Sequence, residues 1–158
     1  MIVVPDSGPL IYLASANQLE LLRLLYGTVV VPRAVFEEVT VAGAGMIGAA
    51  EVLAASWLQI EDQTPDPELL RVLDRGESAA IPLAERLHAI LLVDDGDARA
   101  VATRRGLAVI GTLGVLVAAR RRGLVAQIAP VLDVMAGHGM FVSVDLRRRV
   151  LEMVDEAE

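Results

Sequence analysis

The chain has 158 residues, of which 54% are apolar and 3% aromatic, and carries a net charge of −7; this predicts one globular domain and excludes a disordered chain. It has no cysteine, which excludes disulfides and thiolate metal sites, and its two histidines leave almost no material for a multi-histidine site. All 14 basic residues are arginine, so P-loop and Schiff-base chemistry, which need a lysine, are excluded too.

Short apolar runs rich in β-branched residues alternate with amphipathic segments along the chain. The expected strands are 2–5, 28–31, 57–60, 90–93 and 107–110. A capping box at Asn17 and Glu20 predicts a helix that ends at residue 25. The other expected helices are 10–14, 33–40, the alanine-rich part of 41–56, 69–74, 77–87, 98–105, 113–122, 129–136 and 144–155.

This alternation is typical of a parallel sheet covered by helices on both faces. We therefore predict an α/β fold over residues 1–158, a three-layer α/β/α sandwich with a central, mostly parallel five-stranded sheet. The chain shows neither a basic leader nor the roughly 20 apolar residues that span a bilayer. We expect a cytoplasmic protein without a membrane partner.

Two of the expected strands end directly in aspartate, one at Asp6 and the other at Asp94 and Asp95. If both strands are central and parallel, these carboxylates share one edge of the sheet, where open α/β sheets bind ligands. Like charges about 4 Å apart repel by about 1 to 4 kcal/mol. A cation relieves that repulsion, and Mg²⁺ and Mn²⁺ prefer carboxylate ligands.

Each of these acids also has a purely structural explanation. Asp6 or Ser7 would cap the helix that follows the first strand, and Asp94 or Asp95 would cap the helix after the fourth. Asp97 would then interact favourably with the dipole of that second helix. One cap cannot employ three acids, so both interpretations stay open at this stage.

Two further acidic positions lie on expected helices. Glu77 follows Gly76 at a helix start, where the dipole alone explains a glutamate. Pro82 interrupts this helix, so either the helix kinks there or it begins near residue 80 and leaves Glu77 in a loop. Of Glu37 and Glu38, one is expected to be a solvated surface residue.

Four motifs occur in a characteristic order and spacing. They are Asp6-Ser7-Gly8-Pro9-Leu10-Ile11-Tyr12-Leu13, Pro32-Arg-Ala-Val-Phe-Glu-Glu38-Val, Gly76-Glu77-Ser-Ala-Ala-Ile, and Leu92-Val93-Asp94-Asp95-Gly-Asp-Ala98-Arg99 followed by Gly111-Thr112-Leu113-Gly114-Val115-Leu116. This pattern resembles the PIN-domain family, and within it a subfamily of mostly uncharacterised proteins similar to VapC toxins. The resemblance covers about residues 2–125, with C-terminal helices in 126–158 beyond it.

The resemblance implies a ribonuclease that depends on Mg²⁺ or Mn²⁺ and hydrolyses RNA phosphodiester bonds. The catalytic and metal-binding acids that it implies are Asp6, Glu38, Glu77 and Asp95, with Asp94 and Asp97 as further candidate ligands. Glu38 is preferred to Glu37 because the family's glutamate directly precedes an apolar residue. Ser7 would add a hydroxyl, and Arg99 would orient a carboxylate or contact a phosphate. A bound divalent cation lowers the pKa of water, which suits a chain with so few other catalytic groups.

RNA binding by an acidic protein requires a local basic surface. The candidates are the arginine clusters at 104–105, 120–122 and 147–149. Arginines at helix ends also complement the helix dipole without any ligand, so this second interpretation stands beside the first.

Two other functional classes compete with the nuclease. Aspartyl phosphotransfer domains are disfavoured, because Gly8 stands where a phosphatase would need its second aspartate and no lysine exists for a receiver domain. A catalytically degenerate domain that binds protein or RNA is the stronger alternative. The segment 41–58, with Met46, Ile47, Val52 and Leu53, would then contact an antitoxin-like partner or a second copy in a homodimer; ordinary core packing is the interpretation we favour for it.

Overall fold

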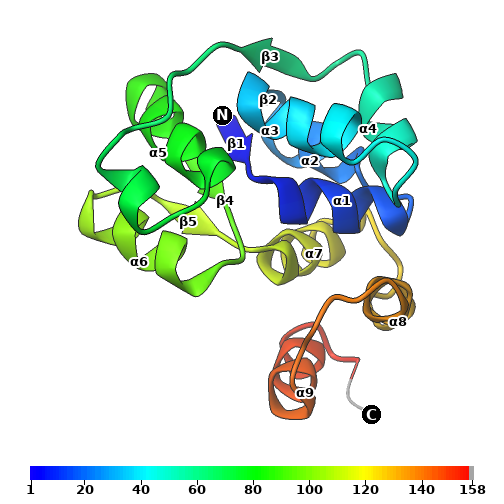
Figure 1. Cartoon of the computed structure of the whole chain (residues 1–158). Helices are drawn as coiled ribbons and strands as arrows, with labels where there is room; N and C mark the ends of the chain where they lie inside the picture. The colour runs from blue at the N-terminus through cyan, green and yellow to red at the C-terminus, as the bar shows by residue number, and fades with distance from the viewer. Residues whose placement is uncertain (157–158) are drawn as a thin grey trace.

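The computed structural model describes residues 1–156 and has a five-stranded sheet at its centre (Figure 1). The strands are β1 (Ile2–Pro5), β2 (Thr28–Pro32), β3 (Gln59–Glu61), β4 (Ile90–Leu92) and β5 (Val109–Ile110). All neighbouring strands pair in parallel, in the order β3-β2-β1-β4-β5. The strand order reverses at β1, so the carboxyl ends of β1 and β4 mark the switch point at which such sheets bind ligands.

Helices cover both faces of this sheet. They are α1 (Ser7–Ser15), α2 (Leu21–Tyr26), α3 (Arg33–Glu37), α4 (Ala49–Ala54), α5 (Arg75–Leu87), α6 (Gly96–Arg104), α7 (Thr112–Arg121), α8 (Ala129–Gly137) and α9 (Val144–Met153), with a π-helical turn over Glu38–Ala42 and a 3₁₀ turn over Leu69–Arg71. The π-helical turn extends α3, where the sequence predicts a regular helix to residue 40.

Alternation along β1 divides the core into two layers. Val3 packs with Leu10 of α1 and Leu116 of α7 on one face, whereas Val4 packs with Ile81 of α5 on the other. All five of these side chains are fully buried, and each buried aliphatic side chain contributes about 1.5 to 3 kcal/mol. The predicted three-layer α/β/α sandwich is confirmed, and its sheet is parallel throughout.

The C-terminal helices extend the layer that contains α1 and α7 (Figure 1). Val131, Leu132 and Met135 of α8 and Leu151 of α9 belong to the same apolar cluster as Val3. The prediction that the first three form a core-facing stripe is therefore confirmed. None of the helices in residues 1–156 is long and apolar enough to cross a membrane.

The capping box predicted at Asn17 and Glu20 is wrong. Asn17 has a φ of 58°, a left-handed conformation that asparagine tolerates better than most residues. The N–H of Leu21 bonds to the carbonyl of Gln18 in a turn, and α2 begins only at Leu21. The Glu20 side chain pairs with Arg23 instead.

Of the two alternatives for the helix that carries Glu77, a start near residue 80 is wrong, because α5 runs from Arg75 through Pro82. Proline has no N–H to donate to the carbonyl four residues earlier, which here belongs to Ser78. The N–H of Asp66 donates to that oxygen instead, at 2.9 Å. With this carbonyl satisfied, α5 stays regular enough to place Glu77 in its first turn.

The prediction that the segment 41–58 packs in the core is wrong for most of its large apolar side chains. Val52 is fully buried, but Met46, Ile47 and Leu53 are exposed. The reason is geometric, since α4 has six residues and only the face with Ala49 and Val52 is buried, where the helix packs on α1 and on the π-helical turn. The glycine-containing loop before α4 adds no second layer that would cover the other face.

Candidate metal centre

Asp6 directly follows β1 at the carboxyl edge of the sheet. Its N–H donates to the carbonyl of Leu92 at 2.9 Å, which extends the β1–β4 ladder, and the residue is 8% exposed. Asp6 stands at the N-cap of α1 but makes no capping bond with its side chain. Its Oδ1 atom is buried and has no hydrogen-bond partner among the described residues. An ionised oxygen in this position is unfavourable unless a proton or a cation reaches it.

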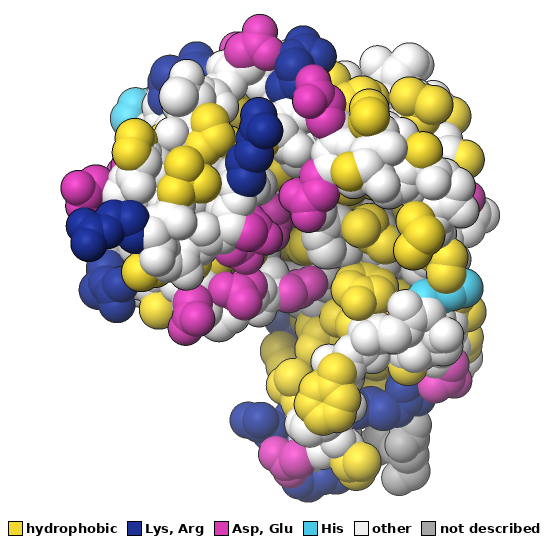
Figure 2. Space-filling view, in the orientation of Figure 1, with side chains coloured by type: hydrophobic (Ala, Val, Ile, Leu, Met, Phe, Trp, Pro, Cys, Tyr) yellow, Lys and Arg dark blue, Asp and Glu magenta, His cyan; other side chains and the backbone are white. Residues whose placement is uncertain are grey.

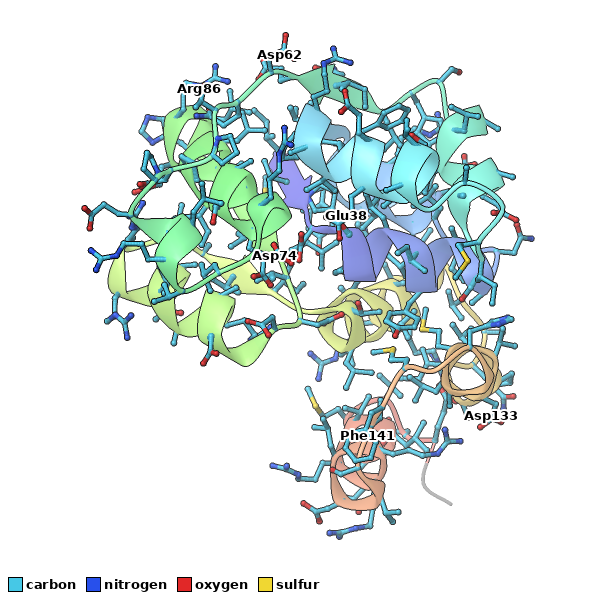
Figure 3. All side chains as sticks on the ribbon, in the orientation of Figure 1. Glu38, Asp62, Asp74, Arg86, Asp133 and Phe141 are labelled. Atoms are coloured by element: carbon cyan, nitrogen blue, oxygen red, sulfur yellow. The ribbon has the colours of Figure 1, made fainter. Side chains whose placement is uncertain are left out.

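Glu38 approaches Asp6 across the first turn of α5. A Cβ atom on Gly76 would lie 2.9 Å from Oε2 of Glu38 and 3.1 Å from Oδ1 of Asp6. Figure 3 shows Glu38 and Asp74 near the centre of the molecule, where α1, α3 and α5 meet, and Figure 2 shows acidic side chains gathered across the middle of this face. Glu38 is therefore the glutamate of the pair 37–38 that reaches the end of β1.

Glu77 enters the same region from α5 and is 7% exposed. It forms a reciprocal capping box with Asp74, whose Oδ1 accepts from the N–H of Glu77 at 2.7 Å. The Oε1 atom of Glu77 in turn accepts from the N–H of Asp74 at 3.2 Å. Glu77 thus has the helix-start role expected from its position, and it is also one of the acids that surround Asp6.

The acids around the end of β1 perturb one another. Burial raises the pKa of Asp6 to about 7, and the charges of Asp74, Glu77 and Glu38 add to the effect, while a hydrogen bond from the N–H of Ser7 opposes it. Burial also raises the pKa of Glu77 to about 7, with further contributions from the nearby Asp74 and Asp95. Two raised carboxyl pKa values in one cluster mark a place where a proton or a metal ion would be stabilising.

Asp94 and Asp95 follow β4 and have different partners. Asp94 accepts from the N–H of Thr112 at 2.8 Å and from its hydroxyl at 2.6 Å. Asp95 is the N-cap of α6 and accepts from the N–H of Ala98 at 2.9 Å. Asp95 thus caps the helix after β4, as one of the two structural alternatives predicted, whereas Asp94 instead binds the first residue of α7. Asp95 is the one of the two whose charge acts on Glu77.

The remaining predicted residues lie at the margin of the cluster. Ser7 is buried beside Asp6, and its Oγ has no partner among the described residues. Nη1 of Arg99 donates to the carbonyl of Val93 at 3.1 Å, which holds the guanidinium next to Asp94. Asp97 is exposed in the first turn of α6, in a pocket that it shares with Leu73 rather than with Asp6.

The residues present suit a divalent cation in chemistry but do not surround one in this conformation. Within residues 1–156, no three Asp, Glu or His side chains converge closely enough to hold a single ion. Asp6 and Glu38 approach one space, whereas Glu77 and Asp95 are turned toward backbone N–H groups. The unpartnered Oδ1 of Asp6, the open space at Gly76 and an all-carboxylate donor set fit Mg²⁺ or Mn²⁺.

Sequence reasoning missed three residues that shape this centre. Asp74 carries a signal, because an aspartate three residues before a glutamate is the spacing of a capping box. Thr112 and Gly76 have no comparable signal. Their roles depend on Asp94 and Glu38, which the fold brings to them from distant parts of the chain.

The arginine clusters are largely engaged with the chain's own acids. The ion pairs are Arg105 with Asp66 and Glu85, Arg120 with Glu156, Arg147 with Asp133, and Arg148 and Arg149 with Asp145. Arg104 and Arg120 also stand in the last turns of α6 and α7, where a cation complements the dipole. This arrangement favours the helix-end interpretation over a large basic surface.

A parallel α/β/α sandwich with carboxylates gathered at its switch point defines the general class of this protein. The chain belongs to the PIN-domain family, because the family model described as a PIN domain matches residues 2–156. That match includes α8 and α9, which lie beyond the resemblance seen in the sequence motifs. PIN domains are generally nucleases and generally use divalent metal ions.

A solved structure has the same fold. It is a PilT N-terminus domain protein from the hyperthermophilic archaeon Sulfolobus solfataricus P2, with a TM-score of 0.51 and 15% sequence identity. The similarity covers 90% of this chain and 98% of that chain. At this identity the comparison establishes the fold alone. A search of curated proteins gave no match.

Proposed function

We propose that this protein is a divalent-metal-dependent ribonuclease that hydrolyses RNA phosphodiester bonds. The observation that carries the proposal is Asp6, a buried carboxylate at the switch point whose Oδ1 lacks any donor and whose pKa is raised to about 7. A protein that used Asp6 only as the N-cap of α1 would form a side-chain capping bond there, and Asp6 forms none; its carboxyl accepts only from the N–H of the adjacent Ser7.

Asp6, Glu38, Glu77 and Asp95 are the residues that would hold Mg²⁺ or Mn²⁺, with Asp94 and Asp97 as outer candidates. When bound, the ion supplies a water of lowered pKa and positive charge near the phosphate oxygens. The β1–β4 ladder fixes the backbone of Asp6, so this residue would hold the ion at the carboxyl edge of the sheet. Glu77 and Asp95 would release their backbone N–H partners to join the ion.

Two arginines beside the acids support an RNA substrate. Arg75 lines a surface pocket of about 450 Å³ together with Glu38 and Asp74. Arg99 lines a second pocket, of about 490 Å³, together with Asp94. Neither arginine makes an ion pair with a described residue. Arg99 donates one N–H to the carbonyl of Val93 and keeps other guanidinium N–H groups for a phosphate, whereas the paired arginines of the clusters are engaged with acids.

A different function, a binding module with a degenerate site, is favoured by one observation. Met46, Ile47 and Leu53 are exposed on the segment 41–58, which suits contact with a protein. In the nuclease proposal the same surface would meet an antitoxin-like inhibitor or a second copy in a homodimer. A binding module would keep its partner after loss of the acids, whereas nuclease activity would not survive that loss.

The test is thermal unfolding against Mn²⁺ concentration for the wild type, Asp6→Asn and Asp95→Asn. We expect Mn²⁺ to raise the melting temperature of the wild type, since a ligand at 100 times its Kd adds about 2.7 kcal/mol. Both substitutions should reduce that rise, and Asp6→Asn should stabilise the metal-free protein by removing a buried charge. Glu51→Gln, an exposed acid in the first turn of α4, is the matched control.

Cleavage of single-stranded RNA by the wild type but not by identically purified Asp6→Asn would support a ribonuclease that depends on Asp6. If Mn²⁺ leaves the melting temperature unchanged and both substitutions destabilise the protein, the acids are structural. The binding-module function would then replace the nuclease.

A further inference from the structure

Gly76 is the second residue of α5 and lies beside two carboxylates of the centre, those of Glu38 and Asp6. A Cβ atom there would lie 2.9 Å from Oε2 of Glu38, 3.1 Å from Oδ1 of Asp6 and 3.3 Å from Cγ2 of Val35. The first two distances are shorter than ordinary van der Waals contacts, and both are to carboxylate oxygens. The missing side chain therefore keeps open a space that two acids border.

Backbone conformation does not explain a glycine at this position. Gly76 is absent from the residues with positive φ, and it lies within a regular helix of 13 residues. Alanine is a better helix former than glycine by about 1 kcal/mol. Helix propensity alone would thus favour a side chain here, so the reason for glycine lies in what surrounds it.

The two carboxylate oxygens that border this space accept no hydrogen bond from a described residue. Oδ1 of Asp6 is buried without a partner, and the Glu38 side chain makes no hydrogen bond or ion pair with a described residue. Two carboxylate oxygens that face one small space without a donor between them are the surroundings of a cation rather than of a packed side chain.

We propose that Gly76 is a positioning residue of the metal centre, whose missing side chain leaves the room in which Asp6 and Glu38 share a divalent cation. This inference rests on the proposed function. It assigns a site role to a residue that bears no ligand atom. It also explains how α5 can pack on α3 without separating the two carboxylates.

The competing explanation is helix packing, because Val35 of α3 is also close to Gly76. Under that explanation an added methyl group would destabilise the protein and leave metal affinity unchanged. The atom nearest the methyl group argues against a large packing cost. It is the end of the Glu38 side chain, which is exposed and can move away.

The experiment is Mn²⁺ titration of Gly76→Ala by calorimetry, with melting temperature in EDTA as the measure of folding. We expect a cooperatively folded protein whose Mn²⁺ affinity is lower by about 10- to 100-fold, the range seen when residues around metal ligands are altered. Gly8→Ala is the matched control, since Gly8 is the second residue of α1 and an added Cβ would meet nothing within 4 Å. It should bind Mn²⁺ as the wild type does.

A double variant keeps the test decisive if Gly76→Ala does not fold. Glu38→Asp withdraws the carboxylate and makes room for the methyl group, so adding Gly76→Ala to it should fold. The effects of the two substitutions should be non-additive. Gly76→Ala should lower Mn²⁺ affinity less in the Glu38→Asp background than in the wild type. If the Gly76→Ala single variant is unfolded, the double variant should still fold.

Wild-type Mn²⁺ affinity in Gly76→Ala would overturn the inference while leaving the nuclease proposal intact. Additive effects in the double variant would do the same, because they would show that the methyl group does not act through Glu38. Failure of the wild type itself to bind Mn²⁺ would overturn both. Only the last of these three outcomes affects the nuclease proposal, so the experiment distinguishes failure of the Gly76 inference from failure of the proposed function.

Discussion

The ends of β1 and β4 lie side by side, and each carries an aspartate, but the two aspartates have opposite surroundings. Asp94 accepts two hydrogen bonds from Thr112, at 2.8 and 2.6 Å, so both of its oxygens are satisfied. Asp6 is more deeply buried, and its Oδ1 has no partner at all among the described residues.

The contrast separates an acid whose oxygens are both hydrogen-bonded from one with a buried, unpartnered oxygen. Asp94 links the start of α7 to the end of β4, because its carboxylate accepts hydrogen bonds from the buried Thr112. Asp6 stabilises nothing with its free oxygen and carries an electrostatic cost that persists in the folded protein. Under the proposed function, a cation bound at Asp6 would offset this cost.

The largest effect that would sharpen this contrast is the pH dependence of metal-free stability. The folded pKa of Asp6 is about 7, above its ordinary value of 3.8, so the folded state holds a proton that the unfolded state has lost. Its stabilising contribution is complete below about pH 4 and is lost as the pH rises through about 7. Each unit corresponds to about 1.4 kcal/mol, so the free energy of unfolding should fall by on the order of 2 to 4 kcal/mol across that window.

Urea unfolding in EDTA at a series of pH values from 4.5 to about 8 measures this fall. Asp6→Asn removes the titrating group and should flatten the profile, leaving the smaller slope due to Glu77, whose pKa is raised in the same direction. Saturating Mn²⁺ should reverse the slope, because the ion favours the charged carboxylates. If the free energy of unfolding of the wild type in EDTA does not change with pH, the raised pKa of Asp6 is contradicted.

An intermediate effect concerns Asp94. Asp94→Ala leaves the N–H and hydroxyl of Thr112 without acceptors, and Thr112 is fully buried. The free energy of unfolding should fall by about 2 kcal/mol, the cost of a lost cap with unsatisfied groups. Thermal or urea unfolding checks this, and the rise in melting temperature with Mn²⁺ should persist.

Asp97→Ala is the control for that variant, because Asp97 is a neighbouring exposed acid in the first turn of α6. It should cost no more than about 0.5 kcal/mol, the contribution of one charge to the helix dipole. If instead Asp94→Ala abolishes the Mn²⁺ effect while barely changing stability, Asp94 belongs with Asp6 and the contrast between the two strand ends fails.

The sequence predicts the elements whose ends are set locally better than those whose ends depend on neighbours. The first strand is predicted with its observed bounds because Asp6 and Pro9 end it within a few residues. The predicted fifth strand, 107–110, shrinks to Val109–Ile110, since the N–H of Leu107 bonds to the carbonyl of Ala102 and closes α6. That bond depends on how the helix ends, which apolar patterning does not specify.

The same distinction holds for the candidate site. Asp6 and Asp95 could be predicted because each follows a buried strand, and strand ends converge in a parallel sheet. The opposite states of Asp6 and Asp94 could not be predicted, because they depend on whether a donor such as Thr112 arrives from another element. Partner choice is a property of tertiary packing, so the chemical role of an acid appears only when its neighbours are known.

The smallest expected effect tests whether RNA binds near the carboxyl end of β1, where Asp6 lies. Arg75 lines the pocket that contains Glu38 and Asp74, is exposed and makes no ion pair with a described residue. Arg75→Gln should raise the KM for RNA by about three- to tenfold, consistent with loss of one phosphate contact, and leave kcat nearly unchanged. Steady-state cleavage assays at two salt concentrations measure it.

Arg71→Gln is the matched control for this last substitution. Arg71 is equally exposed and free of ion pairs among the described residues, but it lies on the 3₁₀ turn before α5 and does not line that pocket. Its removal lowers the net charge by the same amount, so it reports the general electrostatic effect alone. Equal increases in KM for the two variants would mean that RNA is attracted by overall charge. A larger increase for Arg75→Gln would place the phosphate beside the carboxylates that Asp6 anchors.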